Sequence, residues 1–270
     1  MDSISLARKV REHSVKMVHR GRSSHIGSAL SIVDILAVLY TDVLNISLET
    51  VNDPERDIFI LSKGHAGASL YATLAERGFF PISDLDQHYQ NGSLYSGHVS
   101  HKGIPGVEFS TGSLGHGLPV AVGIALAAKL DGLKNKVFVL LGDGEILEGS
   151  NWESLAFASH HKLDNLCIII DRNNLQSFKS TEATIALEPM VDKFLAFGVG
   201  CQRVHGHDHT KLKAEFSSME DDRPKVIIAD TIKGKGISYM ENQVLWHYKY
   251  PDEEQLKLAL EEISGGMSES

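Results

Sequence analysis

Apolar positions along the chain repeat with two different periods, and these periods predict its elements. Residues 4–20 alternate apolar and basic side chains in a way that indicates an amphipathic helix. Residues 30–44 are almost wholly apolar, so we expect a second helix there that is buried. Further helices are expected at about 66–77, 118–131, 151–161, 190–197 and 210–219.

Short, continuous apolar runs lie between these helices. Val137–Leu141 and Leu166–Ile170 are apolar throughout, and such runs indicate strands of a parallel sheet that is covered by helices on each side. Asp57–Leu61, residues 200–204 and Val226–Ala229 are interpreted as three more strands. We therefore predict an α/β fold, a doubly wound and mostly parallel sheet with helices on both faces.

The regular pattern is interrupted once and fades near the C-terminus. Residues 91–117 are rich in glycine and have little helical period, and a long loop inside a compact domain is usually functional. Residues 263–270 are expected to form a frayed tail. The sequence thus predicts one domain over residues 1–262, followed by this short tail.

Composition narrows the class of protein. The chain is 42% hydrophobic and 23% charged, as in soluble globular proteins, and it has no apolar run of the about 18 residues that a membrane span needs. Its net charge of −9 disfavours a nucleic-acid partner, whose phosphates would be repelled. Cys167 and Cys201 are too far apart for a zinc or redox motif. The N-terminus lacks the apolar segment of a signal peptide, so we expect a cytoplasmic protein without membrane contacts.

Oxygen-bearing side chains follow two of the predicted strands. Asp143, within Gly142-Asp143-Gly144, comes directly after one strand, and Asn173 follows the next. Parallel strands end at the same edge of a sheet, where α/β folds bind ligands, so these side chains should meet. A carboxylate and an amide oxygen suit Mg²⁺ or Ca²⁺, and Mg²⁺ completes its octahedron with phosphate oxygens and water.

The glycines of the same segment predict a phosphate site beside the metal. Gly142 and Gly144 allow a phosphate to approach the backbone, and the helix that starts near Gly149-Ser150 should point its amides towards it. A Gly-Asp-Gly turn alone is common. The order of strand, Gly-Asp-Gly, helix, strand and Asn173-Asn174 is far more specific.

This order resembles the thiamine diphosphate motif, and the chain resembles the N-terminal half of transketolase over roughly residues 5–260. The resemblance implies a thiamine diphosphate-binding fold, with thiamine diphosphate and Mg²⁺ (or Ca²⁺) as cofactors. It is carried by short motifs that keep the family's order and spacing: Ser24-His25-Ile26-Gly27, Leu61–Ala66, Ser96-Gly97-His98, Thr111–Gly117, Thr231–Gly236 and Trp246-His247.

The resemblance also implies roles for matching residues. Asp143 and Asn173 would ligate the divalent ion together with the backbone carbonyl of Leu175, while His65 and Gly144 would meet the diphosphate. The residues implied to bind the cofactor are His65, Gly112, Ser113, Leu114, His116, Gly142, Asp143, Gly144, Glu145, Asn173 and Lys233.

Two positions depart from the usual family pattern. Ile26 stands where proline often follows the first histidine of the family. Isoleucine at this position is frequent in members that are split into two subunits. His116 stands where glutamine is usual, and a hydrogen-bonding role could survive because both side chains offer donors and acceptors. By resemblance, Gly112 and Leu114 near it would contact the aminopyrimidine ring through their backbone.

Histidines are frequent, with 14 in the chain, and most histidines serve structure. By resemblance, His25, His98 and His247 would line the substrate channel as catalytic residues, because imidazole can donate to a sugar hydroxyl and exchange protons near neutral pH. Glu148 and Glu153 are grouped with them as members of an acidic network at the subunit contact.

A second cluster invites a zinc hypothesis. His205, His207, Asp208 and His209 are compactly spaced, but three ligands within five residues rarely build a closed tetrahedral site. We do not favour zinc here, because the family often carries a Gly-His-Asp turn at this point.

One catalytic group of the family has no counterpart in this sequence. In transketolases a glutamate of the second domain polarises the aminopyrimidine ring, and neither Glu108 nor Glu145 matches its motif. We therefore expect a split enzyme, active only with a C-terminal partner subunit that carries the pyrimidine domain, in an α2β2 heterotetramer. The small-residue helix expected at 118–131 and the apolar helix expected at 30–44 would suit an interface with that partner subunit.

The predicted function is transfer of a two-carbon ketol unit from a ketose, or its phosphate, to an aldose acceptor. One alternative keeps the cofactor but passes the carbon unit to a lipoyl or carrier-protein thiol. Another is a non-catalytic regulatory subunit, which would predict a damaged metal motif, whereas Asp143 and Asn173 are intact.

Overall fold

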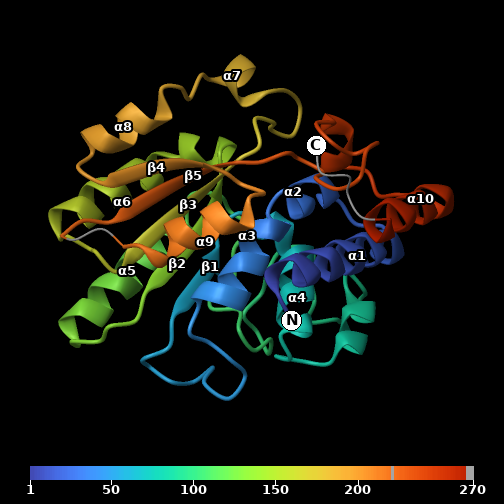
Figure 1. The fold of residues 1–270 in the computed structure, drawn as a ribbon, viewed down its shortest axis with the longest axis horizontal. Helices are drawn as coiled ribbons and strands as arrows, with labels where there is room; N and C mark the ends of the chain where they lie inside the picture. The colour runs from blue at the N-terminus through green and yellow to red at the C-terminus, as the bar shows by residue number, and fades with distance from the viewer. Residues whose placement is uncertain (220–221, 266–270) are drawn as a thin grey trace.

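The computed structural model describes residues 1–219 and 222–265, and its centre is a five-stranded sheet (Figure 1). Every neighbouring pair of strands is parallel, in the spatial order β1-β2-β3-β5-β4. Gly142 pairs with Asp171, so the polar segments that follow β2 and β3 leave the sheet at one edge. The strands are β1 (Ile58–Leu61), β2 (Val137–Gly142), β3 (Leu166–Arg172), β4 (Gly200–His205) and β5 (Lys225–Asp230).

Side chains of the central strand are divided between two cores. In β3, Cys167 and Ile169 belong to one apolar cluster, and Ile168 and Ile170 belong to the other, because successive side chains of a strand point to opposite faces. None of the four is more than 1% exposed. The continuous apolar runs therefore predicted the α/β fold correctly, with helices on both faces of a parallel sheet.

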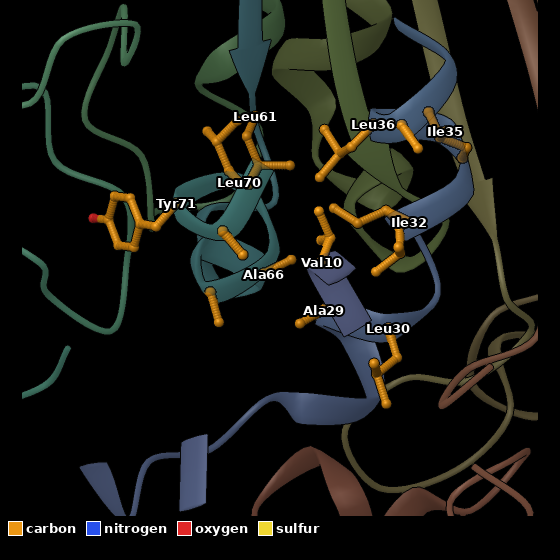
Figure 2. Close-up of a cluster of buried hydrophobic side chains, with 14 of the residues drawn as sticks. Val10, Ala29, Leu30, Ile32, Ile35, Leu36, Leu61, Ala66, Leu70 and Tyr71 are labelled. Atoms are coloured by element: carbon orange, nitrogen blue, oxygen red, sulfur yellow. The ribbon is translucent and has the colours of Figure 1, made fainter. Parts of the chain in front are cut away.

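The helices from both ends of the chain gather on one face of the sheet (Figure 1). Figure 2 shows the centre of this core, where Val10 and Leu36 approach Leu61 at the end of β1 and Leu70 of a neighbouring helix. Helix α1 packs against α3, α4 and α10, which fixes this layer. Its members are α1 (Ser3–Gly21), α2 (Ile26–Leu30), α3 (Val33–Val38), α4 (Gly67–Glu76), α9 (His209–Ser217) and α10 (Glu253–Ser264).

The opposite face carries α5 (Gly117–Leu130), α6 (Gly149–His160) and α8 (Met190–Ala196). Helix α5 turns Ala121 and Ala125 towards the sheet, and their small side chains allow a close approach. Its outer side is also apolar: Gly123, Ala127 and Leu130 are exposed, and Leu130 is 78% accessible. This helix therefore presents an apolar stripe on both sides.

The prediction of one continuous helix over residues 30–44 is wrong. The chain forms α2 and α3, separated at Ser31-Ile32, and then the π-helical segment η1 (Leu39–Val43). At the break, Ser31 Oγ donates a hydrogen bond of 2.7 Å to Asp171 on β3. The predicted burial is confirmed, because α3 packs against α1, α4 and α9 of the same chain. This apolar surface is thus already covered, and the segment does not supply the interface that we expected of it.

The remaining short elements lie in the connections between the main helices and strands. The long loop that we expected is confirmed, because the structure describes neither helix nor strand between Gln87 and Gly117. Helix α10 starts with a capping box formed by Asp252 and Gln255, and it extends to Ser264, two residues into the expected tail. Residues 266–270 of that tail lie outside the described residues. Over the described ranges, no helix is long and apolar enough to cross a membrane. The short elements are η2 (Gly64–Ala66), η3 (Ile82–Gln87), η4 (Gly144–Leu147), α7 (Thr181–Thr184) and η5 (Val244–His247).

Candidate active site

A cavity of about 230 Å³ opens at the edge of the sheet where β1, β2 and β3 end. It receives residues from segments that are far apart in sequence, which agrees with the rule that ligands bind at this edge of α/β folds. All predicted site residues except Ser113, His116, Glu148 and Glu153 line it. The lining is His25, Ser28, Lys63, His65, His98, Gly112, Leu114, Gly142, Asp143, Gly144, Glu145, Asn173, Leu175, Gln176, Ser177, Lys233 and His247.

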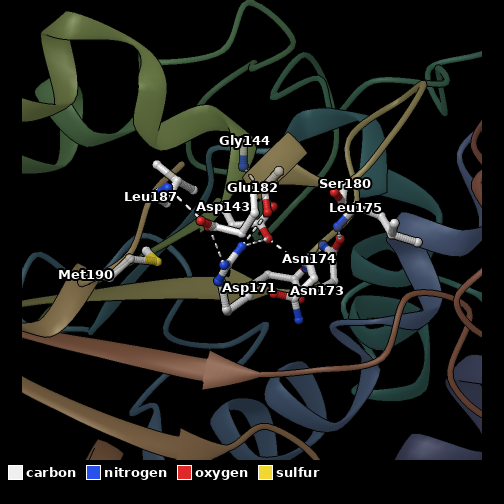
Figure 3. Close-up of polar contacts among 12 residues, drawn as sticks. Asp143, Gly144, Asp171, Asn173, Asn174, Leu175, Ser180, Glu182, Leu187 and Met190 are labelled. Atoms are coloured by element: carbon white, nitrogen blue, oxygen red, sulfur yellow. Dashed lines mark hydrogen bonds and ion pairs between the residues drawn. The ribbon is translucent and has the colours of Figure 1, made fainter. Parts of the chain in front are cut away.

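The predicted metal ligands come from two adjoining loops (Figure 3). Asp143 Oδ2 accepts a hydrogen bond of 2.8 Å from the backbone N–H of Asn174, which joins the loop after β2 to the loop after β3. Asp143 Oδ1 accepts from the N–H of Gly144 at 2.8 Å. Asn173 Oδ1 accepts from the N–H of Leu175 at 3.1 Å, which orients the amide. The loops that carry the three predicted ligands, Asp143, Asn173 and Leu175, are thereby held side by side.

A buried arginine lies behind Asp143. Arg172 is 1% exposed, and its Nη1 donates to Asp143 Oδ2 at 3.0 Å while its Nη2 donates to Glu182 at 2.7 Å. Burial and the neighbouring Asp171 raise the pKa of Asp143, and Arg172 opposes this rise. The guanidinium therefore restrains the carboxylate and partly compensates its charge.

Asp171 is a buried hub beneath the cavity floor. Its carboxylate accepts hydrogen bonds from Lys63 Nζ at 2.5 Å, Ser31 Oγ at 2.7 Å and Asn173 Nδ2 at 2.8 Å, and also from the hydroxyl of Thr231. Burial alone would raise the pKa of Asp171, but Lys63 and the hydrogen bonds outweigh burial and lower it. The hub connects three segments of the chain, those of Ser31, Lys63 and Thr231, to the loop that carries Asn173.

Two lysines provide positive charge to the cavity. Lys63 is 1% exposed and pairs with Asp171. Lys233 Nζ donates to the carbonyl oxygens of Leu175 at 3.1 Å and Gln176 at 3.2 Å. Burial and the nearby Lys63 lower the pKa of Lys233 to about 8, so Lys233 is mostly protonated at neutral pH. An anionic ligand would find complementary charge here.

Four histidine rings gather in the lining of the cavity. The ring centroid of His25 lies 5.1 Å from that of His65, 5.5 Å from that of His98 and 4.9 Å from that of His247. Burial is the main cause that lowers their pKa values, to about 4 for His25 and about 3 for His247. At neutral pH the rings are therefore uncharged and offer one donor and one acceptor each.

The backbone holds these histidines in place. His25 adopts a left-handed conformation with φ of 73°, and its N–H donates to the carbonyl of His247 at 2.9 Å. The carbonyl of His98 accepts from Tyr71 Oη at 3.3 Å, and Tyr71 Oη accepts from the N–H of Ser100 at 3.1 Å. Tyr71 of α4 therefore fastens the loop that carries His98.

Glu145 lines the cavity, but its carboxylate is occupied by the protein. It accepts from the N–H of Gly115 at 3.0 Å and of Gly142 at 3.1 Å, and from the hydroxyl of Ser62. Burial raises the pKa of Glu145. The side chain braces three of the loops on which the resemblance was based.

Four predicted residues lie outside the cavity lining. Ser113, His116, Glu148 and Glu153 are all exposed, and His116 Nδ1 faces the carbonyl oxygens of Ser113 and Leu114 at 3.2 and 3.1 Å. The two glutamates sit at and within the start of α6.

The first residues of α6, whose amides we expected to point towards the phosphate, do not line the cavity. The turn η4 separates Asp143 from Gly149, and the lining of this segment ends at Glu145.

Sequence reasoning missed Ser28, Lys63, Gln176 and Ser177. Lys63 and Gln176 each stand beside a predicted residue, so proximity to His65 and Leu175 in the sequence was the available signal.

The second histidine cluster, which invited the zinc hypothesis, forms hydrogen bonds that stabilise the fold. His207 Nδ1 lies 2.6 Å from Asp34 Oδ2, and His209 Nε2 lies 3.0 Å from Asp34 Oδ1. His207 Nε2 also accepts from the N–H of Ile232 at 2.9 Å. Among the described residues, no group of three or more His, Cys, Asp or Glu side chains could hold a metal ion by itself. These histidines tie α9 and the segment after β5 to α3.

Comparison with protein families matches residues 3–262 to the family described as "Transketolase, thiamine diphosphate binding domain". One subunit of the apulose-4-phosphate transketolase of Actinobacillus succinogenes is 46% identical over 241 residues, which are 88% of this chain and 87% of that protein. The 6-deoxy-6-sulfo-D-fructose transketolase subunit SqwG of Clostridium sp. (strain MSTE9) is 37% identical over 259 residues, which are 95% and 94% of the two chains.

Longer transketolases match only in part of their length. Human transketolase is 36% identical over 95% of this chain but 41% of its own. The solved structure of transketolase from Leishmania mexicana superposes with a TM-score of 0.90 and 30% identity, covering 98% of this chain and 41% of that one. Transketolase from Campylobacter jejuni gives a TM-score of 0.90 at 31% identity, with 97% and 42% covered.

Proposed function

Because this chain belongs to the transketolase family, as its thiamine diphosphate binding domain, we propose that it is the diphosphate-binding subunit of a two-chain transketolase. The complex would move a two-carbon ketol unit from a ketose or ketose phosphate to an aldose. The observation that carries the proposal is the hydrogen-bonded junction of Asp143 with the loop of Asn173, beside two buried lysines.

The donor atoms of this junction fit the metal that we propose. Asp143 would supply a carboxylate oxygen, Asn173 an amide oxygen and Leu175 a backbone carbonyl oxygen, and hard oxygen ligands of this kind suit Mg²⁺ or Ca²⁺. Gly144 is packed closely against the Gln176 side chain, because a Cβ there would lie 3.1 Å from Gln176 Cγ. Lys63 and Lys233 would balance the charge of the diphosphate.

When bound, thiamine diphosphate supplies the carbon nucleophile of the reaction, and the histidines of this chain would manage the substrate around it. Uncharged imidazoles can donate to or accept from the hydroxyl groups of a sugar, and they can move a proton at those oxygens. His25, His98 and His247 are placed to do so because they line the cavity and the rings of His98 and His247 both lie close to that of His25. Neutral rings attract an anionic group only weakly, so recognition of a sugar phosphate would fall to another part of the complex.

The partner would be a C-terminal subunit that carries the pyrimidine domain, in an α2β2 assembly. Relatives named as single subunits of apulose-4-phosphate transketolases match this chain along nearly their whole length. The outer side of α5, with Gly123, Ala127 and Leu130 exposed, is an apolar surface of the kind that interface cores contain. Glu148 and Glu153 are exposed at the adjoining helix α6 and would face the same contact.

Sugar acceptors are preferred over carrier-bound thiols, since the split relatives are named for sugar transketolases. The two cysteines are unpaired and buried, which fits a reducing compartment such as the cytoplasm.

Two experiments test this proposal. Asp143→Ala should abolish Mg²⁺-dependent binding of thiamine diphosphate in calorimetry, whereas Asp192→Ala, at an exposed aspartate of α8, should not change it. Equal affinity of the Asp143 variant and the natural chain would remove the metal assignment. Ketol transfer should appear only when a partner with the pyrimidine domain is added, and full turnover by the chain alone would refute the two-chain assembly.

A further inference from the structure

One hydrogen-bond donor in the cavity has no acceptor. The side-chain nitrogen Nε2 of Gln176 is buried, and it has no hydrogen-bond partner among the residues that the structure describes. Gln176 also lines the cavity. Buried amide groups in folded proteins are nearly always paired, so this donor marks a place where an acceptor from outside the chain belongs.

The backbone fixes where this amide lies. The N–H of Gln176 donates to the carbonyl of Lys179 at 2.9 Å, and its own carbonyl accepts from Lys233 Nζ at 3.2 Å. The side chain lies over Gly144, because a Cβ built on Gly144 would be 3.1 Å from Gln176 Cγ and 3.4 Å from Nε2. The backbone of Gln176 is thus held by Lys179 and Lys233, and its side-chain amide lies against the Gly-Asp-Gly turn.

The neighbouring carboxylate is not the missing acceptor. The oxygens of Asp143 already accept from the N–H of Gly144, the N–H of Asn174 and the guanidinium of Arg172. Lys63 and Lys233 line the same cavity, and their positive charge favours an anion as the missing acceptor.

We propose that Gln176 is a cofactor-binding residue whose Nε2 donates a hydrogen bond to a diphosphate oxygen. The inference rests on the proposed function and adds a residue to it. Gln176 acts as the neutral counterpart of Lys63 and Lys233, because it gives a directed donor where the lysines give charge. It also closes the cavity over Gly144, the residue at which the diphosphate meets the backbone.

Calorimetry with two probes tests the contact in the purified chain. The probes are thiamine diphosphate and inorganic pyrophosphate, each with Mg²⁺. Gln176→Ala should weaken the binding of both by about 10- to 100-fold, as expected for a hydrogen bond to a charged group. Its melting temperature without ligand should stay unchanged, because Nε2 gives up no partner within the chain. Gln87→Ala, at an exposed glutamine, is the matched control and should bind both probes like the natural chain.

Gln176→Glu sharpens the assignment. A carboxylate in this place would repel the diphosphate, so the loss should exceed that of Gln176→Ala for both probes. Unchanged binding of both probes by Gln176→Ala would overturn the proposal. Loss of thiamine diphosphate binding with unchanged pyrophosphate binding would also overturn it, because the amide would then contact the thiamine rings. If the natural chain bound neither probe, the proposed function itself would fail, which is a different result from failure of the glutamine contact.

Discussion

Asp171→Asn removes the charge at the hub beneath the cavity while keeping the size of the side chain. In the natural chain this carboxylate, which is 0% exposed, is the counter-ion of Lys63 Nζ at 2.5 Å. Lys63 is itself 1% exposed, and its other acceptors are the Ser28 carbonyl at 3.0 Å and Ser31 Oγ at 3.5 Å, which are neutral. The substitution therefore removes the carboxylate that pairs directly with this buried ammonium group.

The expected loss of stability follows from that burial. Breaking a buried ion pair by neutralising one partner costs about 3–5 kcal/mol, which is a large part of the about 5–15 kcal/mol that stabilises an ordinary domain. The asparagine amide would also face donors from Ser31 and Thr231, which now donate to the carboxylate. We expect the free energy of unfolding to fall by about 4 kcal/mol.

Urea unfolding followed by tryptophan fluorescence measures this loss, and the midpoint should fall by about 1–2 M if the slope is unchanged. Asp42→Asn is the matched control, because Asp42 pairs with Lys213 at 3.0 Å on the surface, where the lysine side chain is 55% exposed. Surface pairs contribute less than about 1 kcal/mol. If Asp171→Asn cost no more than Asp42→Asn, the account of Asp171 as the charged hub of the site would be wrong.

Two further predictions concern the histidine rings. Tyr71→Phe removes the hydroxyl that joins the His98 carbonyl to the Ser100 N–H. The substitution should lower the free energy of unfolding by about 1 kcal/mol. In the reconstituted enzyme it should raise the KM for the ketose without weakening cofactor binding. The KM effect should vanish in a His98→Ala background, and an additive effect there would contradict the role of Tyr71 in positioning His98. Burial lowers the pKa of His247 to about 3, so below about pH 6.5 the unfolded chain takes up a proton that the folded chain does not. Stability should therefore fall on acidification, and His247→Gln should make the loss between pH 6.5 and 5 smaller in pH-dependent urea titrations. An unchanged slope would show that this ring is not buried in the neutral form.

The sheet and most helices could be predicted because their signals are local. Strands buried on both faces are apolar at every position, as Leu166–Ile170 is, and the amphipathic spacing of residues 4–20 agrees with α1. The break at Ser31 could not be predicted in this way. It goes with a hydrogen bond to Asp171, 140 positions further along the chain, and nothing in the surrounding apolar run signals that contact.

In the site, too, features that follow from local sequence patterns could be predicted, whereas contacts between distant residues could not. The meeting of the Asp143 and Asn173 loops followed from the parallel sheet, because adjacent strands end at one edge. The ion pair of Lys63 with Asp171 depends on which side chains the sheet register brings together, and these two lie 108 positions apart. Ser113 and His116 belong to a continuous motif and stand beside lining residues, yet both are exposed and outside the cavity lining.

The parallel arrangement also constrains how the protein is made. The first strand, β1, sits at an edge of the sheet and pairs with β2 alone. Leu61 ends β1 and Val137 begins β2, so during synthesis β1 must wait, unpaired, while helix α4 and the long loop emerge from the ribosome. Non-local pairings of this kind are slow to form, and unpaired apolar strands promote aggregation. We expect the N-terminal half of the nascent chain to depend on chaperones until β2 has been translated.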